Sequence, residues 1–347
     1  RLADLPDAAA AGAAALRRAG AGIVVAICHS GPGDGAGGSG CENAARAVAA
    51  GGGVNAVIAA HTHKVTAIGA PVPLVQPGAF GSHLGVIDLH LARKDGRWRP
   101  VPAGVAALPV PAQGGAGGAP RLARPAAALH AAARRRSRCL VGRSEVALTT
   151  HFALLGPSAA LDLVAESQIA VLARLVDTGE TPVLAAVSPF RAGGAAGPLA
   201  YADIPPGPVT HGAIEALYPY VNRLAAFRIS GAGLRAWLEH AARIFVSPVP
   251  GPAPAPLLRA DVPAHDYDVI GGLEYRIDIG REAGRITGLC HRGRPVEDGA
   301  SFILVTNSYR VAGGGGYPLP DPSARLALPE TPARDILTAH IAATSPL

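Results

Sequence analysis

Residues 23–63 read IVVAICHSGPGDGAGGSGCENAARAVAAGGGVNAVIAAHTH, and this stretch decides the fold of the first part of the chain. The apolar run at 23–27 predicts a buried strand. A glycine-rich loop at 31–40 and a helix at 42–50 follow, and the apolar run at 54–60 predicts a second buried strand. This order is typical of a βαβ unit with two parallel strands. The sequence therefore predicts an α/β architecture here.

Histidines stand just beyond both predicted strands. His29 follows the first strand, and His61 and His63 follow the second. Ligands of α/β sheets bind at the carboxyl ends of parallel strands, and alternate residues of an extended segment point to the same side. Imidazole nitrogens are common ligands of zinc and similar ions. We expect a metal site at this edge of the sheet; the alternative is that these are ordinary polar loop histidines.

Outward from this unit, the pattern indicates a second domain. Short strands are expected near 73–76 and 85–91, and the Pro/Gly/Ala-rich residues 103–125 with a helix at 126–136 predict a linker. Helices near 161–175 and 231–244 and strands near 181–187, 223–229, 273–279 and 302–306 follow without regular alternation, which favours an α+β domain. We therefore expect a first domain at 1–102, a linker with a connecting helix at 103–138 and a second domain at 139–347.

Composition narrows the classes of function. The 347 residues are 49% hydrophobic with a mean hydropathy of +0.26, enough for two folded domains, and a net charge of +6 comes from scattered basic residues. Outside 134–136 these residues do not cluster, which favours a small anionic substrate over a nucleic-acid polymer. No window reaches the roughly 18 apolar residues of a membrane span, so we expect no association with a membrane.

Several longer motifs carry a resemblance to a known family. They are VVAICHSG at 24–31, ENAARAVAAGGGVNAVIAAHTH at 42–63, VPLVQPGAFGSHLGVIDLHL at 72–91, SPFRAGG at 188–194, ALYPYVN at 216–222, YDVIGGLEYRIDI at 267–279 and TNSYRVAGGGGYP at 306–318. The chain resembles the periplasmic 5′-nucleotidase family of metallophosphoesterases, and within it the branch of bifunctional 2′,3′-cyclic-nucleotide 2′-phosphodiesterase/3′-nucleotidases. The resemblance implies the C-terminal part of a metallophosphatase α/β sandwich, a linker helix, a 5′-nucleotidase C-terminal-like α+β domain and a periplasmic location in a bacterium.

The same resemblance assigns roles to the histidines. It implies that His29 and His61 bind one metal ion and His63 its partner, in a site of two divalent ions drawn from Mn, Co, Zn or Mg. The D-x-H, metal-bridging Asp and G-N-H-[DE] motifs of the family have no counterpart in these residues. Two divalent ions about 3.5–4 Å apart normally share a bridging carboxylate. We therefore expect the catalytic residues and remaining ligands to lie before Arg1, and this chain alone to be inactive.

Substrate recognition is expected in the second domain. The resemblance implies that Tyr220 and Tyr309 hold a nucleobase between their rings, an interaction that tolerates any base; the alternative is that both are core residues. Arg191 follows an apolar run and precedes glycines that allow the backbone to approach a ligand closely. We expect it to contact a phosphate or ribose, with an ordinary surface arginine as the alternative.

The function expected of the intact protein is hydrolysis of 2′,3′-cyclic nucleotides to 3′-nucleotides and then of the 3′-phosphate. Its partners would be small nucleotide substrates, and its oligomeric state stays open. One alternative is a 5′-nucleotidase or nucleotide-sugar hydrolase, although the run Ser188–Arg191 departs from the Asn-Gly-Gly-Gly-Ile-Arg typical of 5′-nucleotidases. Another is a nucleotide-binding module without catalysis.

Overall fold

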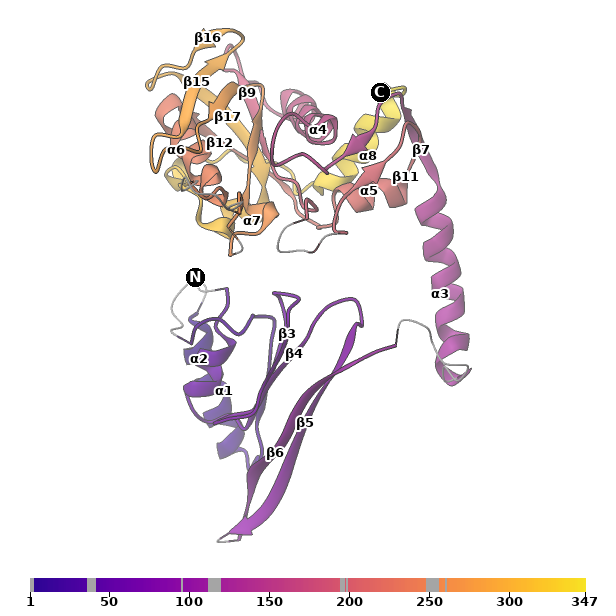
Figure 1. The fold of residues 1–347 in the computed structure, drawn as a ribbon, viewed down its shortest axis with the longest axis vertical. Coiled ribbons are helices and arrows are strands. Elements are labelled where there is room, and N and C mark those ends of the chain that lie inside the picture. The colour runs from indigo at the N-terminus through magenta and orange to yellow at the C-terminus, as the bar shows by residue number, and fades with distance from the viewer. Residues whose placement is uncertain are drawn as a thin grey trace. The chain divides into compact units, whose positions relative to one another are not determined.

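A computed structural model describes residues 3–35, 42–94, 96–111, 120–193, 197, 199–247, 256–259 and 261–347. The chain divides into two compact units, residues 1–124 and 125–347 (Figure 1). The division falls inside helix α3 (Pro120–Arg138), in the segment for which the sequence predicts a linker and connecting helix. Among the described residues, no helix is both long and apolar enough to cross a membrane.

The first unit contains a four-stranded sheet with two helices. In chain order its elements are α1 (Leu5–Arg18), β1 (Val25–Cys28), α2 (Ala45–Ala50), β2 (Ala56–Ala59), β3 (Val65–Ile68) and β4 (Leu74–Pro77). The strand order is β1-β2-β4-β3, and β1 lies parallel to β2 with Val25 opposite Ala56 and Cys28 opposite Ala59. The parallel βαβ unit expected from residues 23–63 is therefore confirmed.

One side of this sheet carries the core of the unit. Val48 of α2, Val57 of β2 and Leu74 of β4 are buried together with residues of α1. Side chains alternate between the two faces of a strand, and on the other face Val25, Ile27 and Ile58 are 46%, 82% and 40% exposed. The expectation that both strands are buried is wrong for this face, because no described element of the unit covers these three side chains.

A long hairpin completes the first unit. Its strands β5 (His83–Lys94) and β6 (Arg97–Pro109) pair from His83 opposite Pro109 to Lys94 opposite Arg97, with one irregularity between Asp88 and Leu89. The sequence predicts that residues 103–109 belong to the linker, whereas the structure places them in β6. Proline and glycine weaken the strand pattern there, but pairing with β5 supplies the backbone hydrogen bonds that a strand requires.

The second unit is built on a mixed sheet with the order β12-β17-β9-β13. These strands are β12 (Leu224–Ser230), β17 (Ser301–Asn307), β9 (Val183–Val187) and β13 (Val269–Gly271). Strand β17 runs parallel to β9, so both end at the same edge, while the other two pairings are antiparallel. Strands and helices predicted near 161–175, 181–187, 223–229, 231–244 and 302–306 are all present.

Both faces of this sheet are buried. Ile303 and Val305 of β17 belong to a core shared with α4 (Ala159–Leu175) and α8 (Ala333–Thr344). Phe302 and Leu304 point the other way, into a core with Trp237 of α6 (Gly231–Ala241). The remaining elements are β7 (Leu140–Ser144), β8 (Leu148–Thr149), β10 (Asp203–Ile204), β11 (Gly207–Thr210), α5 (His211–Leu217), β14 (Glu274–Ile277), β15 (Ile286–His291), β16 (Arg294–Pro295) and α7 (Ser308–Val311), with short 3₁₀ turns at Ala242–Ile244, Ala264–Asp266, Gly314–Gly316 and Pro322–Ala324. The fold as a whole is mixed α/β.

Candidate functional site

In the first unit, two of the predicted metal ligands lie side by side. The parallel pairing of β1 and β2 brings their carboxyl ends together. The ring centroids of His29 and His61 are 5.3 Å apart, with the rings inclined at 67°. His61 has a φ of 80°, in the left-handed region, which turns the chain sharply after β2. Two imidazoles at this separation can contribute to the coordination of one ion.

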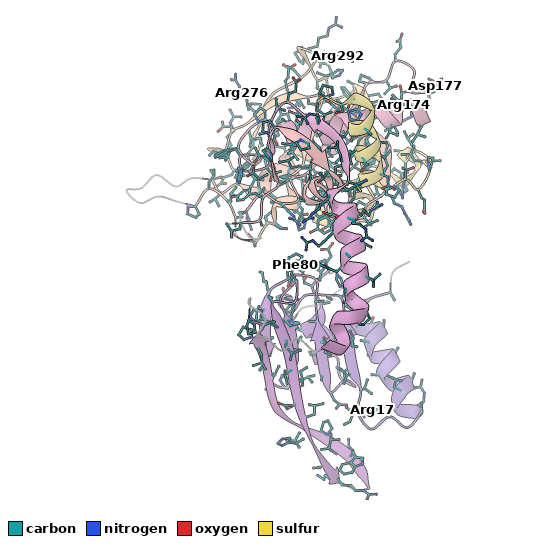
Figure 2. The ribbon with its side chains drawn as sticks, turned by 90° about the vertical axis from the view of Figure 1, so that its right-hand side faces the viewer. Arg17, Phe80, Arg174, Asp177, Arg276 and Arg292 are labelled. Atoms are coloured by element: carbon teal, nitrogen blue, oxygen red, sulfur yellow. The ribbon has the colours of Figure 1, made fainter. Side chains whose placement is uncertain are left out.

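The neighbours of these two rings differ from those of His63. Nε2 of His61 lies 3.4 Å from Oε2 of Glu42, and this hydrogen bond raises the pKa of His61. The ring of His63 instead lies 5.8 Å from that of Phe80, which is itself 96% exposed (Figure 2). His29 and His61 are thus brought together, while the contact recorded for His63 is with Phe80.

The described residues do not provide a complete site for two metal ions. Within the described ranges, no group of three His, Cys, Asp or Glu side chains is placed to hold a metal ion. The two imidazoles offer part of a coordination shell, and Glu42, which contacts His61, does not complete a three-residue metal-binding group with them. The assignment of His29, His61 and His63 as metal ligands stays a prediction.

In the second unit, Tyr309 is positioned by a helix start and a glycine. Oδ1 of Asn307, the last residue of β17, accepts hydrogen bonds from the backbone N–H groups of Tyr309 and Arg310 and so caps α7. The Tyr309 ring packs on Gly314, where a Cβ atom would lie only 2.4 Å from the ring. The glycine run after α7 therefore allows this ring to lie close to the backbone.

Tyr220 packs against other aromatic side chains. It is 43% exposed beyond the end of α5, and its ring lies 5.2 Å from that of Phe190 in an edge-to-face arrangement. Phe190 lies 4.7 Å from the ring of Tyr218, which is 2% exposed. Such contacts between aromatic edges and faces are favourable beyond the area that they bury. Tyr220 is thus a partly exposed ring that packs on Phe190, which in turn packs on Tyr218.

A histidine that the sequence analysis missed links the two tyrosines. The His265 ring lies 6.4 Å from the Tyr220 ring and 6.2 Å from the Tyr309 ring, inclined at 65° and 72° to them. His265 belongs to a 3₁₀ turn far from both tyrosines in the sequence. The motif YDVIGGLEYRIDI begins two residues later, but no pattern in the sequence marks His265 itself.

Beneath these rings lies a buried ion network centred on Arg310, which is 1% exposed. Its guanidinium donates to Asp268 from Nε at 3.0 Å and from Nη2 at 2.8 Å, and to Asp266 from Nη1 at 3.2 Å. The indole nitrogen of Trp237 donates to Oδ2 of Asp268, the oxygen that also accepts from Nε of Arg310. Coulombic attraction to Asp268 raises the pKa of Arg310 despite the opposing effect of burial. A buried charge needs such partners, so the network fixes the backbone that carries Tyr309.

Arg191 lies on the loop after β9. Its carbonyl oxygen accepts a hydrogen bond from the Thr150 hydroxyl, and Ala192 forms a β-bridge with Tyr201. Its guanidinium forms no ion pair within the described part of the chain. Gly193 has a φ of 69°, and a Cβ there would collide with the Tyr201 ring. Gly194 lies outside the described residues.

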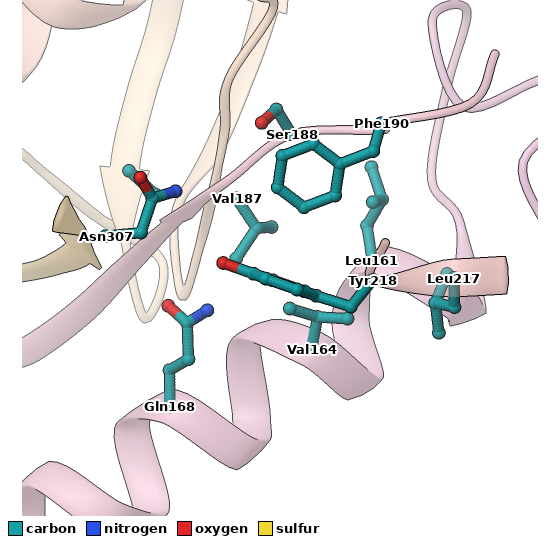
Figure 3. A pocket seen from close by; sticks show the side chains of 10 residues that line it. Leu161, Val164, Gln168, Val187, Ser188, Phe190, Leu217, Tyr218 and Asn307 are labelled. Carbon is teal, nitrogen blue, oxygen red and sulfur yellow. The ribbon is translucent and has the colours of Figure 1, made fainter. Parts of the chain in front are cut away.

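A small cavity, lined by apolar side chains and a few polar ones, lies at the carboxyl ends of β9 and β17 (Figure 3). Its volume is about 10 Å³, close to that of one water-sized sphere. Two buried polar atoms that line it, Oε1 of Gln168 and the hydroxyl of Tyr218, have no hydrogen-bond partner among the described residues. Burial raises the pKa of Tyr218 to about 12, so its hydroxyl stays protonated at neutral pH. Asn307 and Phe190 also line this cavity, so it borders the ring on which Tyr220 packs.

Comparisons with known proteins point to one family. Residues 141–321 match the family described as 5′-nucleotidase, C-terminal domain. A 2′,3′-cyclic-nucleotide 2′-phosphodiesterase/3′-nucleotidase of Salmonella typhimurium is 30% identical over 369 residues, which cover 95% of this chain and 57% of that protein. A trifunctional nucleotide phosphoesterase of Bacillus subtilis is 29% identical over 87% of this chain and 23% of its own length.

Among solved structures, the fold is similar to that of a putative 5′-nucleotidase from Staphylococcus aureus. The TM-score is 0.73 at 17% identity, and the match covers 99% of this chain and 66% of that one. The chain spans less than two thirds of the length of each relative named here. Because the family match covers just over half of its residues, this chain belongs to the 5′-nucleotidase family.

Proposed function

We propose that the intact enzyme hydrolyses 2′,3′-cyclic nucleotides to 3′-nucleotides and then removes the 3′-phosphate, depends on divalent metal ions and works in the periplasm. The observation that carries this proposal is the placement of Tyr220 and Tyr309 around His265 in a unit of the 5′-nucleotidase family. The Salmonella relative, whose name includes both activities, supports the choice of substrate.

In this proposal the second unit binds the nucleotide. Tyr220 and Tyr309 stack on the base, and stacking tolerates any base because every base has an aromatic face. Arg191 binds the phosphate or the ribose, since a guanidinium offers a planar set of donors that suits phosphate oxygens. Its lack of an ion pair with any described side chain leaves those donors available to a ligand.

The catalytic residues of the intact enzyme lie, in this proposal, outside these 347 residues. Within the described part, His29, His61 and the neighbouring Glu42 do not form a group able to hold a metal ion, and this supports the division. The exposed side chains of Val25, Ile27 and Ile58 also support it, since apolar side chains on a sheet normally pack against another layer. The chain of 347 residues would then bind nucleotides without hydrolysing them.

The test compares the natural full-length protein with the 347-residue chain. Ring opening of 2′,3′-cyclic AMP to 3′-AMP, and phosphate release from 3′-AMP and from 5′-AMP, are measured with Mn²⁺, with Co²⁺ and after treatment with EDTA. We expect turnover by the full-length protein that EDTA abolishes, and none by the chain. A strong preference for 5′-AMP would instead support the 5′-nucleotidase alternative, and turnover that survives EDTA would refute metal dependence.

A second candidate is a nucleotide-binding protein without catalysis. The absence of any three-residue metal group among the described residues favours it. The same assay separates the two candidates, because this one expects the full-length protein to bind 3′-AMP and to hydrolyse neither substrate under any metal condition.

A further inference from the structure

We propose that His265 is a specificity-determining residue, which contacts the edge of the nucleobase held by Tyr220 and Tyr309 and makes the site prefer some bases over others. This inference rests on the proposed nucleotide site and deepens it. Two stacking tyrosines alone do not distinguish one base from another. A polar ring between them adds what stacking lacks.

The orientation of the imidazole determines how it can meet a base. A base stacked on a tyrosine lies parallel to that ring. The His265 ring is inclined at 65° to Tyr220 and at 72° to Tyr309, so it cannot stack on the same base. An inclined ring can approach the base with its edge, which carries Nδ1 and Nε2.

That edge is chemically able to discriminate. An imidazole carries two ring nitrogens, each of which donates or accepts a hydrogen bond according to the tautomer. The edges of adenine, guanine, cytosine and uracil carry different arrangements of donors and acceptors. A hydrogen bond that one base can form and another cannot contributes about 1 kcal/mol, or about fivefold in affinity. The ligand class is therefore a purine or pyrimidine nucleotide whose base edge complements the imidazole.

The backbone of His265 is held in place by the same network that positions Tyr309. Nη2 of Arg310 donates to the carbonyl oxygen of His265, and the other guanidinium nitrogens bind Asp266 and Asp268. Arg310 directly follows Tyr309 in the chain, so one buried side chain ties the two segments together. The residues on either side of His265, Ala264 and Asp266, are 9% and 8% exposed. Groups held this firmly lose little freedom on binding, which favours selectivity.

The experiment measures dissociation constants of the 347-residue chain for 3′-AMP, 3′-GMP, 3′-CMP and 3′-UMP by calorimetry. His265→Phe keeps an aromatic ring and removes both nitrogens, and His265→Asn restores one donor and one acceptor. His130→Phe, on an exposed position of α3, is the matched control. We expect the wild type and the control to separate the strongest from the weakest base by about fivefold or more. His265→Phe should reduce that spread to within about twofold, and His265→Asn should restore part of it.

Two results would overturn the proposal: a wild-type chain that binds all four nucleotides equally, or a His265→Phe chain that keeps the wild-type spread. Circular dichroism checks that each variant folds, and if His265→Phe does not, the His265→Asn series decides by whether the order of base preference changes. Failure of the wild-type chain to bind any of the four nucleotides is a different outcome, since it refutes the nucleotide site itself.

Discussion

The Tyr309 ring packs against Gly314 on a segment held by Arg310, so its removal should affect ligand binding more than folding. We expect Tyr309→Ala to weaken nucleotide binding by about 1–3 kcal/mol, the range for loss of one stacked base, and by similar amounts for adenine and uracil. Calorimetric titration with 3′-AMP and 3′-UMP measures this. Unchanged affinity for both would remove Tyr309 from the binding site.

Substitution of Gly314 tests the position of the Tyr309 ring without removing that ring. Its backbone is not in the left-handed region, so alanine meets no conformational penalty there, but the new Cβ would lie 2.4 Å from the Tyr309 ring and must displace it. We expect Gly314→Ala to weaken binding of all four 3′-nucleotides while the melting temperature changes little. Gly156→Ala is the matched control, because nothing lies within 4 Å of its added Cβ. Equal affinities in the two variants would show that the ring position does not matter.

His240 gives the fold a dependence on pH. Burial lowers its pKa, and the neighbouring Arg243 lowers it further, while a contact with the Gly315 carbonyl and nearby Asp266 oppose this. Nε2 of the His240 ring lies against both the Gly315 carbonyl oxygen and Nη1 of Arg243. Because the folded pKa lies below the unfolded value, the unfolded chain binds more protons in the interval between them, so stability falls as pH drops through about 6.5.

We therefore expect His240 to destabilise the folded protein at acidic pH. Comparison of wild type with His240→Asn by urea unfolding should show the wild type losing more stability between pH 7 and pH 5 than the variant does. Other histidines titrate in both proteins alike, so the difference isolates His240. Parallel losses in the two proteins would contradict the prediction.

Buried charged side chains connect three elements of the second unit: helix α6, the turn at Ala264–Asp266 and helix α7. Asp268 accepts from Arg310 and from the indole of Trp237. We expect Asp268→Asn to destabilise the second unit by about 3–5 kcal/mol, because it leaves a buried guanidinium with one carboxylate fewer. Urea unfolding measures the loss. Asp261→Asn, in the exposed pair with Arg259, is the control, and a similar effect of both substitutions would show that burial is not the cause.

Runs of apolar residues correctly predicted the strands whose formation depends mainly on neighbouring residues in the sequence. The apolar runs at 23–27 and 54–60 gave the parallel pair β1 and β2, and the runs at 181–187 and 302–306 gave β9 and β17. Strand β6 was missed because prolines and glycines hide its alternation, and its existence depends on pairing with β5. The exposed face of β1 was also missed, since hydrophobicity reports which residues favour burial but not whether a partner layer is present.

The candidate sites show the same division. The sequence motifs singled out Tyr220 and Tyr309, but nothing local indicated that His265 links them. That link arises from contacts between residues far apart in the chain, which the ion pairs of Arg310 with Asp266 and Asp268 hold in place. Likewise, His63 was grouped with His61 by spacing, whereas a left-handed φ of 58° and a contact with Phe80 govern its position.

The last prediction concerns the 347-residue chain purified alone. His29 and His61 lie together, but imidazole ligands carry no negative charge to offset that of two divalent ions, which normally share a bridging carboxylate. We therefore expect the chain to hydrolyse bis(p-nitrophenyl) phosphate no faster than buffer, with Mn²⁺ or Co²⁺ present. His29→Ala is the control for contaminating phosphatases, since any turnover that the variant retains does not come from this site. Metal-dependent turnover that the wild-type chain shows and His29→Ala loses would mean that the ligand set is complete within these residues, with the missing ligands supplied by segments outside the described ranges.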